Sequence, residues 1–344
     1  GDVYKRQTHS RVGEALCTER KRTGFRRGRP RVKRPRIPIM DEKKEIKMEI
    51  RKIFVVGSGL MGSGIAQTAI QAGYEVILND QSKAALERGQ AGISKRLDRL
   101  VEKGRMTAEE KEACMGRLTT SVSVHVASNV DMVIEAIYEN LEAKQSIFQQ
   151  LDKICDSRTI FASNTSSISM TSLAAATSRP EKVVGMHFFS PVPVMSLVEI
   201  VYGLRTSKET IDIVDELGKS MGKRTILAKD KPGFIVNRML LPMLNEAVQV
   251  LDEDIGTVED VDEGMMRGCN HPMGPLALAD MIGLDILLEV METFYLDLGD
   301  TKYRPAHLLR KMVSAGYLGR KSGAGFYVYD EGKKIGVNPV LSKA

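Results

Sequence analysis

One stretch of the chain, residues 53–80 (IFVVGSGLMGSGIAQTAIQAGYEVILND), constrains the fold more than any other. It begins with the apolar run Ile53–Val56, which is typical of a buried parallel strand. Gly57, Gly59 and Gly62 follow at G-x-G-x-x-G spacing and lead into a run of helical character. In such a unit the first glycine allows a tight turn, the second lets a pyrophosphate approach the backbone, and the third lets the helix pack on the sheet. The helix N-terminus adds free N–H groups and a positive dipole end. The stretch therefore predicts a dinucleotide site.

The acidic residue at the end of this stretch indicates which dinucleotide binds. A second apolar run, Glu75 to Leu78, ends at Asp80, which lies 23 residues after Gly57. A carboxylate at this position accepts hydrogen bonds from the ribose 2′-hydroxyl and repels a 2′-phosphate. A glycine-rich turn in some other α/β protein is the alternative, but the strand, the helix and the acid all agree with a nucleotide site. We expect NAD rather than NADP as the cofactor.

Length and composition narrow the class of protein. A chain of 344 residues predicts about two domains with ample core. No apolar run approaches the ~20 residues that a membrane span needs, so we expect a soluble protein with no membrane partner. Four cysteines are scattered without a C-x-x-C pair, which argues against a disulfide framework or a zinc site. Reduced thiols are typical of a cytosolic protein, and we expect a cytoplasmic location and no metal.

The beginning of the chain distorts the charge balance. Residues 1–39 hold thirteen Lys or Arg and three Asp or Glu, so residues 40–344 carry a net charge of −4 while the whole chain carries +6. The segment KRTGFRRGRPRVKRPR has no apolar periodicity, and we expect residues 1–47 to be disordered and not native to the fold. A nucleic-acid-binding tail and a transit peptide are alternatives, but the segment has few serines and no amphipathic helix. We favour upstream sequence translated ahead of a start at Met40 or Met48.

Strand and helix patterns alternate along the first two thirds of the chain. This alternation predicts a Rossmann-like, doubly wound, mainly parallel sheet over residues 48–230. After Lys231-Pro232-Gly233 helical periodicity dominates, and we expect an all-helical C-terminal domain over residues 231–344, with a short strand or extended tail at Phe326–Tyr329. The expected strands cover residues 53–56, 75–78, 118–120, 132–135, 159–163, 182–188, 197–201 and 223–227. The expected helical segments cover residues 81–115 (one or two helices), 141–154, 235–252, 257–267, 274–295 and 307–315.

A histidine and a glutamate in neighbouring strand patterns suggest a proton carrier. His187 closes the run VVGMHFF, and Glu199 follows 12 residues later inside the apolar run SLVEIV. A carboxylate in such a strand needs a buried partner. The proline turn between the two runs would let the strands return on each other, so that Glu199 holds one ring nitrogen and makes the other a better base. A core histidine and an unrelated ion pair fit the spacing equally well.

Polar residues also gather where another strand pattern ends. The segment ASNTSSIS at residues 162–169 follows a predicted strand, and ligands bind at such strand ends in doubly wound sheets. Its hydroxyls are candidate substrate donors, candidate N-caps for the next helix, or both. Asn237 is a polar residue among apolar ones in GFIVNRML, and alone it indicates only helix packing.

Several segments, taken together in order, resemble the 3-hydroxyacyl-CoA dehydrogenase family, and the short 3-hydroxybutyryl-CoA dehydrogenases look most similar. The resemblance runs from residue 50 to residue 330 without large gaps. Its motifs are EAIYENL (135–141), FASNTSS (161–167), GMHFFSPVPVMSLVEIV (185–201), DKPGFIVNRML (230–240), HPMGPLALADMIGLD (271–285) and GRKSGAGFYVY (319–329).

The resemblance implies catalytic roles for four residues. His187 matches the family's catalytic base, and Glu199 matches the carboxylate that pairs with it. Ser166 and Asn237 match the groups that hold the substrate oxygen. Many members carry asparagine in an HFFNP motif where this chain has Ser190, a difference that bears on fine substrate preference.

The resemblance also implies a cofactor site. Glu139 and Lys144 match positions near the nicotinamide and the coenzyme A thioester. The cofactor-binding residues that we expect are Gly57, Gly59, Leu60, Met61, Gly62, Asp80, Glu139, Lys144 and Asn164.

The implied activity is the NAD-dependent interconversion of (S)-3-hydroxyacyl-CoA and 3-oxoacyl-CoA, with short substrates such as 3-hydroxybutyryl-CoA and acetoacetyl-CoA, in a homodimer. Three alternatives remain. A related dehydrogenase of the gulonate type would act on a free hydroxy acid, although HFFSPVPV favours the acyl-CoA branch. A crystallin-like relative would be non-catalytic, although the full set of site residues argues against it. A nucleic-acid-binding module rests on the basic leader alone.

Overall fold

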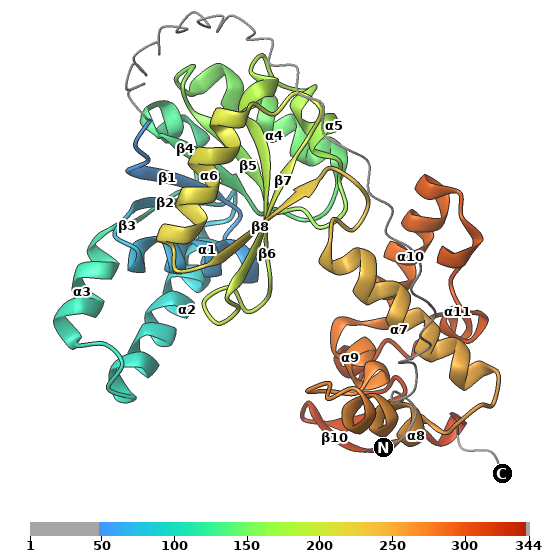
Figure 1. The fold of residues 1–344 in the computed structure, drawn as a ribbon. Coiled ribbons are helices and arrows are strands. Elements are labelled where there is room, and N and C mark those ends of the chain that lie inside the picture. The colour runs from blue at the N-terminus through green and yellow to red at the C-terminus, as the bar shows by residue number, and fades with distance from the viewer. Residues whose placement is uncertain (1–47, 342–344) are drawn as a thin grey trace, which may run out of the picture. The chain divides into compact units, whose positions relative to one another are not determined.

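A computed structural model describes residues 48–341 of the chain. The predictions for the basic leader, residues 1–47, lie outside this range. Within it the chain forms an eight-stranded sheet with helices on both faces and then a mainly helical C-terminal part, coloured orange to red in Figure 1. None of the helices in this range combines the length and apolar character needed to cross a membrane.

The sheet has the strand order β3-β2-β1-β4-β5-β6-β7-β8. All neighbouring pairs are parallel except β6 and β7, which run antiparallel. This confirms the Rossmann-like, mainly parallel sheet predicted from the sequence. The strands are β1 (Lys52–Val56), β2 (Glu75–Asn79), β3 (Leu118–Ser121), β4 (Met132–Glu135), β5 (Ile160–Ser163), β6 (Val183–Phe188), β7 (Leu197–Tyr202) and β8 (Arg224–Lys229).

Helices on both faces bury the sheet. The α-helices are α1 (Leu60–Gln71), α2 (Lys83–Glu102), α3 (Ala108–Gly116), α4 (Leu141–Ile154), α5 (Met170–Ala174) and α6 (Lys208–Ser220), and the short 3₁₀ helices are η1 (Val124–Asn129) and η2 (Pro180–Lys182). Side chains alternate along each strand, so the sheet faces two separate apolar clusters. The first-face cluster contains Ile53 and Val55 with residues of α1, α2 and α6. The second-face cluster contains Phe54 and Val56 with residues of α4 and α5.

The C-terminal part has its own apolar core, which includes Leu244, Leu287 and Phe294, all with no exposed surface. It is helical as predicted, and it also contains a two-stranded antiparallel hairpin where a single strand or tail was expected. Its helices and strands are α7 (Val236–Asp252), α8 (Val258–Glu263), the π-helical turn η3 (Gly264–Gly268), α9 (Pro275–Ile282), α10 (Leu284–Leu298), η4 (Thr301–Tyr303), α11 (His307–Ser314), η5 (Arg320–Ser322), β9 (Tyr327–Asp330), β10 (Lys333–Val337) and η6 (Pro339–Leu341).

The expected helical segment 274–295 is two helices. The chain breaks at Gly283, whose φ of +111° lies outside the range that other residues readily adopt. There the N–H of Leu284 donates to the carbonyl of Leu318 rather than to the preceding helical turn. The break therefore depends on a segment more than thirty residues away in the sequence.

Candidate active site

The glycine loop joins β1 to α1 as the sequence predicts. A Cβ on Gly62 would lie 1.8 Å from the carbonyl oxygen of Gly57, so only glycine lets the helix approach the loop this closely. Gly57 has a φ of +97°, and a Cβ there would lie 2.6 Å from the carbonyl oxygen of Ala136. A Cβ on Gly59 would meet nothing within 4 Å, so this glycine faces open space. The loop is packed tightly against the protein on one side and leaves room for a ligand on the other.

Asp80 lies at the end of β2 beside this loop. Its Oδ2 accepts hydrogen bonds from the backbone N–H of Ser58 at 2.9 Å and from the Ser58 hydroxyl at 2.8 Å, and its Oδ1 accepts from the N–H of Ser82 at 3.0 Å. Partial burial opposes ionisation, but these N–H and hydroxyl donors outweigh it and lower the pKa of the Asp80 carboxyl. The residue is therefore a fixed anion next to the predicted phosphate-binding turn. Ser58 was not singled out from the sequence.

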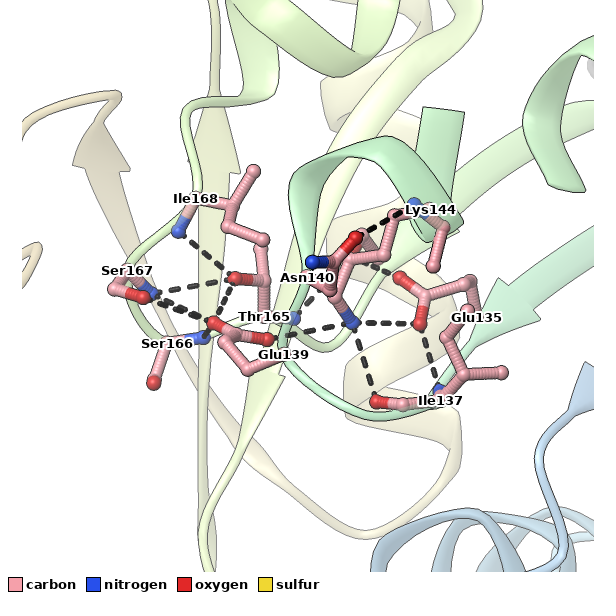
Figure 2. A network of polar contacts seen from close by, with 11 residues as sticks. Glu135, Ile137, Glu139, Asn140, Lys144, Thr165, Ser166, Ser167 and Ile168 are labelled. Atoms are coloured by element: carbon pink, nitrogen blue, oxygen red, sulfur yellow. Dashed lines mark hydrogen bonds and ion pairs between the residues drawn. The ribbon is translucent and has the colours of Figure 1, made fainter. Parts of the chain in front are cut away.

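A buried ion pair lies at the ends of the neighbouring strands β4 and β5 (Figure 2). The ammonium of Lys144, on α4, lies 2.6 Å from Oε1 of Glu135 at the end of β4. Lys144 is 1 % exposed and Glu135 has no exposed surface. The same ammonium donates to the carbonyl of Ile137 and lies 3.3 Å from Oε2 of Glu139. Glu135 also accepts a hydrogen bond from the hydroxyl of Ser163 at 2.5 Å. The three N–H groups of the Lys144 ammonium thus have three protein partners, Glu135, Ile137 and Glu139. The predicted part of Lys144 in cofactor binding stays a prediction.

Glu139 connects this ion pair to the serine-rich loop. Its Oε1 accepts hydrogen bonds from the backbone N–H groups of Ser166 and Ser167 at 3.1 and 3.3 Å and from the hydroxyl of Thr165. Figure 2 shows the Glu139 carboxylate between this loop and Lys144. Burial opposes ionisation, yet the Lys144 charge and the hydroxyl and N–H donors lower the pKa of Glu139. Because the anion gathers these N–H groups around one oxygen, it fixes the loop that carries Ser166.

His187 and Glu199 lie directly opposite each other in the antiparallel pair β6–β7. Nδ1 of His187 is 2.6 Å from Oε2 of Glu199, and the two side chains are 6 % and 0 % exposed. An ionised Glu199 accepts the Nδ1 hydrogen, which leaves Nε2 as the basic nitrogen of the ring. The structure thus brings His187 and Glu199 together in one histidine–carboxylate contact, and the role of this pair in proton transfer stays a prediction.

The second oxygen of Glu199 holds the first helix of the C-terminal part. Oε1 accepts hydrogen bonds from the backbone N–H groups of Ile235 and Val236 at 3.0 and 3.1 Å, at the start of α7. A helix N-terminus has unpaired N–H groups and a positive dipole end, so a buried carboxylate is stabilised there. One side chain therefore contacts both the histidine and the helix that carries Asn237.

The other predicted site residues differ in their exposure and in their hydrogen bonds to the protein. Oδ1 of Asn164 accepts the N–H of Phe188, so it links the ends of β5 and β6. Leu60 is 69 % exposed at the glycine loop, whereas Met61 packs against the first-face cluster. Within residues 48–341 the side chains of Ser166 and Asn237 make no hydrogen bond to the protein. Both are half-buried polar groups without an internal partner.

Besides Ser58, two further residues that shape the site were not singled out from the sequence. Glu135 stands inside the apolar run MVIE, which is the same signal that drew attention to Glu199 in SLVEIV. Ser169, inside the segment predicted to be polar and ligand-facing, is the N-cap of α5, and its hydroxyl accepts the N–H of Ser172. The segment therefore contains an N-cap, as one alternative proposed.

Comparisons with known proteins agree with this architecture. The NAD binding domain of the 3-hydroxyacyl-CoA dehydrogenase family matches residues 52–231, and the C-terminal domain of the same family matches residues 233–329. A probable 3-hydroxybutyryl-CoA dehydrogenase of Bacillus subtilis is 52 % identical over 284 residues, which cover 83 % of this chain and 99 % of the relative. A 3-hydroxybutyryl-CoA dehydrogenase of Clostridioides difficile is 45 % identical over 280 residues, which cover 81 % of this chain and 100 % of the relative. The crystal structure of (S)-3-hydroxybutyryl-CoA dehydrogenase PaaH1 from Ralstonia eutropha superposes with a TM-score of 0.81 at 52 % identity, covering 82 % of this chain and 100 % of that one.

Proposed function

This chain belongs to the 3-hydroxyacyl-CoA dehydrogenase family, and we propose that it interconverts short (S)-3-hydroxyacyl-CoA and 3-oxoacyl-CoA substrates. It is an NAD-dependent oxidoreductase, as the family of its N-terminal domain indicates. The proposed substrate pair is 3-hydroxybutyryl-CoA and acetoacetyl-CoA. The names of the Bacillus and Clostridioides relatives, at 52 % and 45 % identity, support this chain length.

The observation that carries the proposal is the 2.6 Å contact between Nδ1 of His187 and Oε2 of Glu199. In the oxidative direction Nε2 of His187 accepts the proton of the substrate C3 hydroxyl. Glu199 stabilises the imidazolium that forms, because its carboxylate is held as a buried anion by the N–H groups of Ile235 and Val236 at the start of α7. In the reductive direction the imidazolium returns this proton to the C3 oxygen. General acid–base catalysis of this kind contributes about 10²–10⁴-fold to the rate.

The cofactor site has the chemistry that NAD requires. Gly59 leaves open space at the N-terminus of α1, and the Asp80 anion beside it would accept hydrogen bonds from ribose hydroxyls. When bound, NAD supplies the hydride acceptor, and NADH supplies the hydride. The protein residues hold the substrate, its oxygen and its proton.

Ser166 and Asn237 are the proposed donors to the C3 oxygen. Each residue is half-buried, and its side chain has no hydrogen-bond partner within the described part of the chain, so each side chain has a free donor to offer. A well-aimed donor to a developing oxyanion contributes about 3 kcal/mol in enzymes of known mechanism. Glu139 would keep Ser166 in place through the loop backbone.

One assay separates the proposed function from its alternatives. Purified protein is mixed with NADH and acetoacetyl-CoA, and the loss of NADH is followed by absorbance. We expect turnover with acetoacetyl-CoA, much slower turnover with NADPH, and none with a free 3-oxo acid of the gulonate pathway type. Turnover with the free acid alone would favour the gulonate-type alternative. Tight NADH binding without any turnover would favour a non-catalytic relative.

We also propose that the protein is a homodimer formed through its C-terminal helices. Exposed apolar side chains on α7 and α10 support this, since Met239 is 66 % exposed and Leu296 is 77 % exposed. Analytical ultracentrifugation tests the proposal, and Leu296→Asp should shift the population toward monomer. A monomeric wild-type protein would contradict it. The cytoplasmic location stays a prediction from the cysteine pattern.

A further inference from the structure

The turn that leads into α7 contains an unusual backbone conformation. Phe234 has a φ of +47°, in the left-handed region. Only three other non-glycine residues of the range 48–341 have a positive φ, namely Asp254, Asn270 and Glu331. Asp and Asn adopt this conformation with little strain, whereas a bulky aromatic residue rarely does. Strained residues of this kind persist where the surrounding structure requires them, and they cluster at functional sites.

The strained residue brings its ring against the histidine of the candidate site. The ring centroids of Phe234 and His187 are 5.5 Å apart with an interplanar angle of 63°, an edge-to-face arrangement. The ring of Phe189 packs at 4.6 Å from the same imidazole. Phe234 is itself 7 % exposed. The imidazole is thus in contact with two aromatic rings while Nδ1 is bound to Glu199.

The residues that follow Phe234 contact the other half of the pair. The N–H groups of Ile235 and Val236 donate to Oε1 of Glu199. Three consecutive residues therefore contact both groups: the Phe234 side chain packs on His187, and the next two backbone N–H groups bind Glu199. The Phe294 ring packs closely against the backbone of this turn, since a Cβ on Gly233 would lie 2.2 Å from that ring. This contact limits the path that the turn can take.

We propose that Phe234 is a positioning residue for His187, an inference that rests on the proposed function of His187 as the proton carrier. The left-handed backbone at residue 234 directs the ring to the imidazole and, in the same turn, aims two N–H groups at Glu199. The ring limits rotation of the imidazole, so that Nδ1 stays on the carboxylate and Nε2 stays available to substrate. A relaxed backbone at this residue would move either the ring or the two N–H groups away.

The alternative is that Phe234 only fills space in the second-face cluster, to which it belongs. The chain offers a matched control for this possibility. Phe161 belongs to the same cluster, has no exposed surface and packs edge-to-face on Phe148 at 5.5 Å. Phe161→Leu therefore makes the same chemical change in the same core and removes an aromatic pair, but that pair does not include His187.

The experiment compares Phe234→Leu, Phe234→Tyr and Phe161→Leu with the wild type. The first readout is nitrogen NMR of histidine-labelled, ligand-free protein, with the His187 signals identified by their loss in His187→Gln. The second is kcat and KM for acetoacetyl-CoA across a pH series. Misplacement of a catalytic group by about an ångström can cost about 10²-fold in rate, so for Phe234→Leu we expect kcat to fall roughly 10- to 100-fold. Its His187 signals should show a mixture of tautomers.

The two other variants set the limits of the interpretation. Phe234→Tyr retains a ring and should keep most of the turnover and the wild-type tautomer. Phe161→Leu should leave the His187 signals unchanged and kcat within about twofold. If Phe234→Leu does not fold, Phe234→Met replaces it, since methionine fills space without a ring.

Unchanged His187 signals in Phe234→Leu (or in Phe234→Met, where it replaces that variant), or a loss of kcat equal to that of Phe161→Leu, would overturn the proposal. Altered His187 signals with wild-type turnover would instead overturn the proposed role of His187 as the base. The two failures are therefore distinguishable.

Discussion

Glu199 and His187 face each other across the single antiparallel pair of the sheet, with Oε2 of the carboxylate 2.6 Å from Nδ1 of the ring. The reversal of direction between β6 and β7 makes this possible, because in an antiparallel pair two residues lie directly opposite each other. Side chains of successive residues in a strand point to opposite faces of the sheet. Met186 and Ile200, which are next to His187 and Glu199 in the chain, belong to the first-face cluster. His187 and Glu199 therefore both point to the second face. A local change in strand direction thus brings together two groups that lie 12 residues apart in the sequence.

The first prediction concerns the proton carried by His187. His187→Gln keeps a similar volume but cannot accept the proton, so kcat should fall by about 10²–10⁴-fold while NAD still binds. Glu199→Gln should also slow turnover, because it removes the charge that stabilises the imidazolium. If the two act as a unit, the double variant should be little worse than His187→Gln alone. Steady-state kinetics and NADH fluorescence measure these effects.

The matched control for this prediction is His125→Gln, the same change at an exposed histidine of η1. It should leave turnover unchanged. Near-normal turnover in His187→Gln would refute the assignment of the base. Losses that multiply fully in the double variant would leave His187 in place but break its functional link to Glu199.

The sequence predicted most elements where local pattern decides them. Strand β4 (Met132–Glu135) and helix α4 (Leu141–Ile154) begin and end at the predicted residues. Apolar β-branched runs and amphipathic periodicity are local signals, and they suffice there. The break at Gly283 was not predicted, because it depends on a hydrogen bond to the distant carbonyl of Leu318. Most of the fold therefore follows from local pattern, and its exceptions follow from tertiary contacts.

The site was predicted in part for the same reason. His187 and Glu199 carried a signal, a polar group inside an apolar strand, and Glu135 carried that signal too without being recognised. Its partner Lys144 lies on a helix and looks like an ordinary surface lysine in EAKQS. The left-handed backbone of Phe234 leaves no trace in residue type, because glycine or asparagine is the usual signal for that conformation. Burial and backbone strain are properties of the folded chain.

The second prediction concerns the ion pair between Glu135 and Lys144. Removing Glu135 leaves the buried Lys144 ammonium with Glu139, at 3.3 Å, as its remaining counter-charge, so Glu135→Gln should lower the free energy of unfolding by up to about 3–5 kcal/mol. Adding Lys144→Met to this variant removes the second charge and should restore part of the loss, since replacing both members of a buried pair is often nearly neutral. Chemical denaturation of the two single variants and the double variant measures the coupling.

An exposed pair serves as the control for the second prediction. Lys208 and Asp212 form an ion pair at 2.7 Å with 84 % and 50 % exposed side chains. Surface pairs are worth about 0–1 kcal/mol, so Lys208→Met should have little effect on unfolding. Equal losses for Glu135→Gln and Lys208→Met would show that burial does not set the strength of the Glu135–Lys144 pair.

The third prediction concerns Asp280, a buried carboxylate of α9. Burial raises its pKa from 3.8 to about 6, although the N–H groups of Phe326 and Tyr327 and the Tyr329 hydroxyl favour the anion. Between these two pKa values the folded state holds a proton that the unfolded state has lost. The folded state is therefore stabilised as pH falls, and this contribution is lost as pH rises through about 6.

The variant Asp280→Asn does not titrate and provides the comparison. The free energy of unfolding of the wild type, relative to this variant, should rise by about 1 kcal/mol between pH 7 and pH 5, because only the pH unit below the pKa of about 6 contributes. Urea unfolding of both proteins at each pH measures the difference between their free energies of unfolding. Titration of the other carboxylates affects both proteins alike and cancels from this difference. A relative stability that stays constant or falls over this range would contradict the raised pKa.

The last prediction concerns the choice between the two cofactors. Asp80 carries a fixed negative charge at the end of β2, where its Oδ2 lies 2.9 Å from the backbone nitrogen of Ser58 in the glycine loop. Asp80→Ser removes an acceptor for the ribose hydroxyls, and hydrogen bonds to charged groups are worth about 1.5–3 kcal/mol, so NAD affinity should fall by about 10- to 100-fold. NADP affinity should rise, because the charge that repels a 2′-phosphate is gone. Glu75→Ser removes one charge from the opposite, exposed end of the same strand and should change neither affinity. Titration of NADH and NADPH fluorescence against the three proteins measures all four changes. If Asp80→Ser binds NADH as tightly as the wild type does, and NADPH as weakly, then Asp80 does not contact the ribose and serves only to hydrogen-bond the glycine loop.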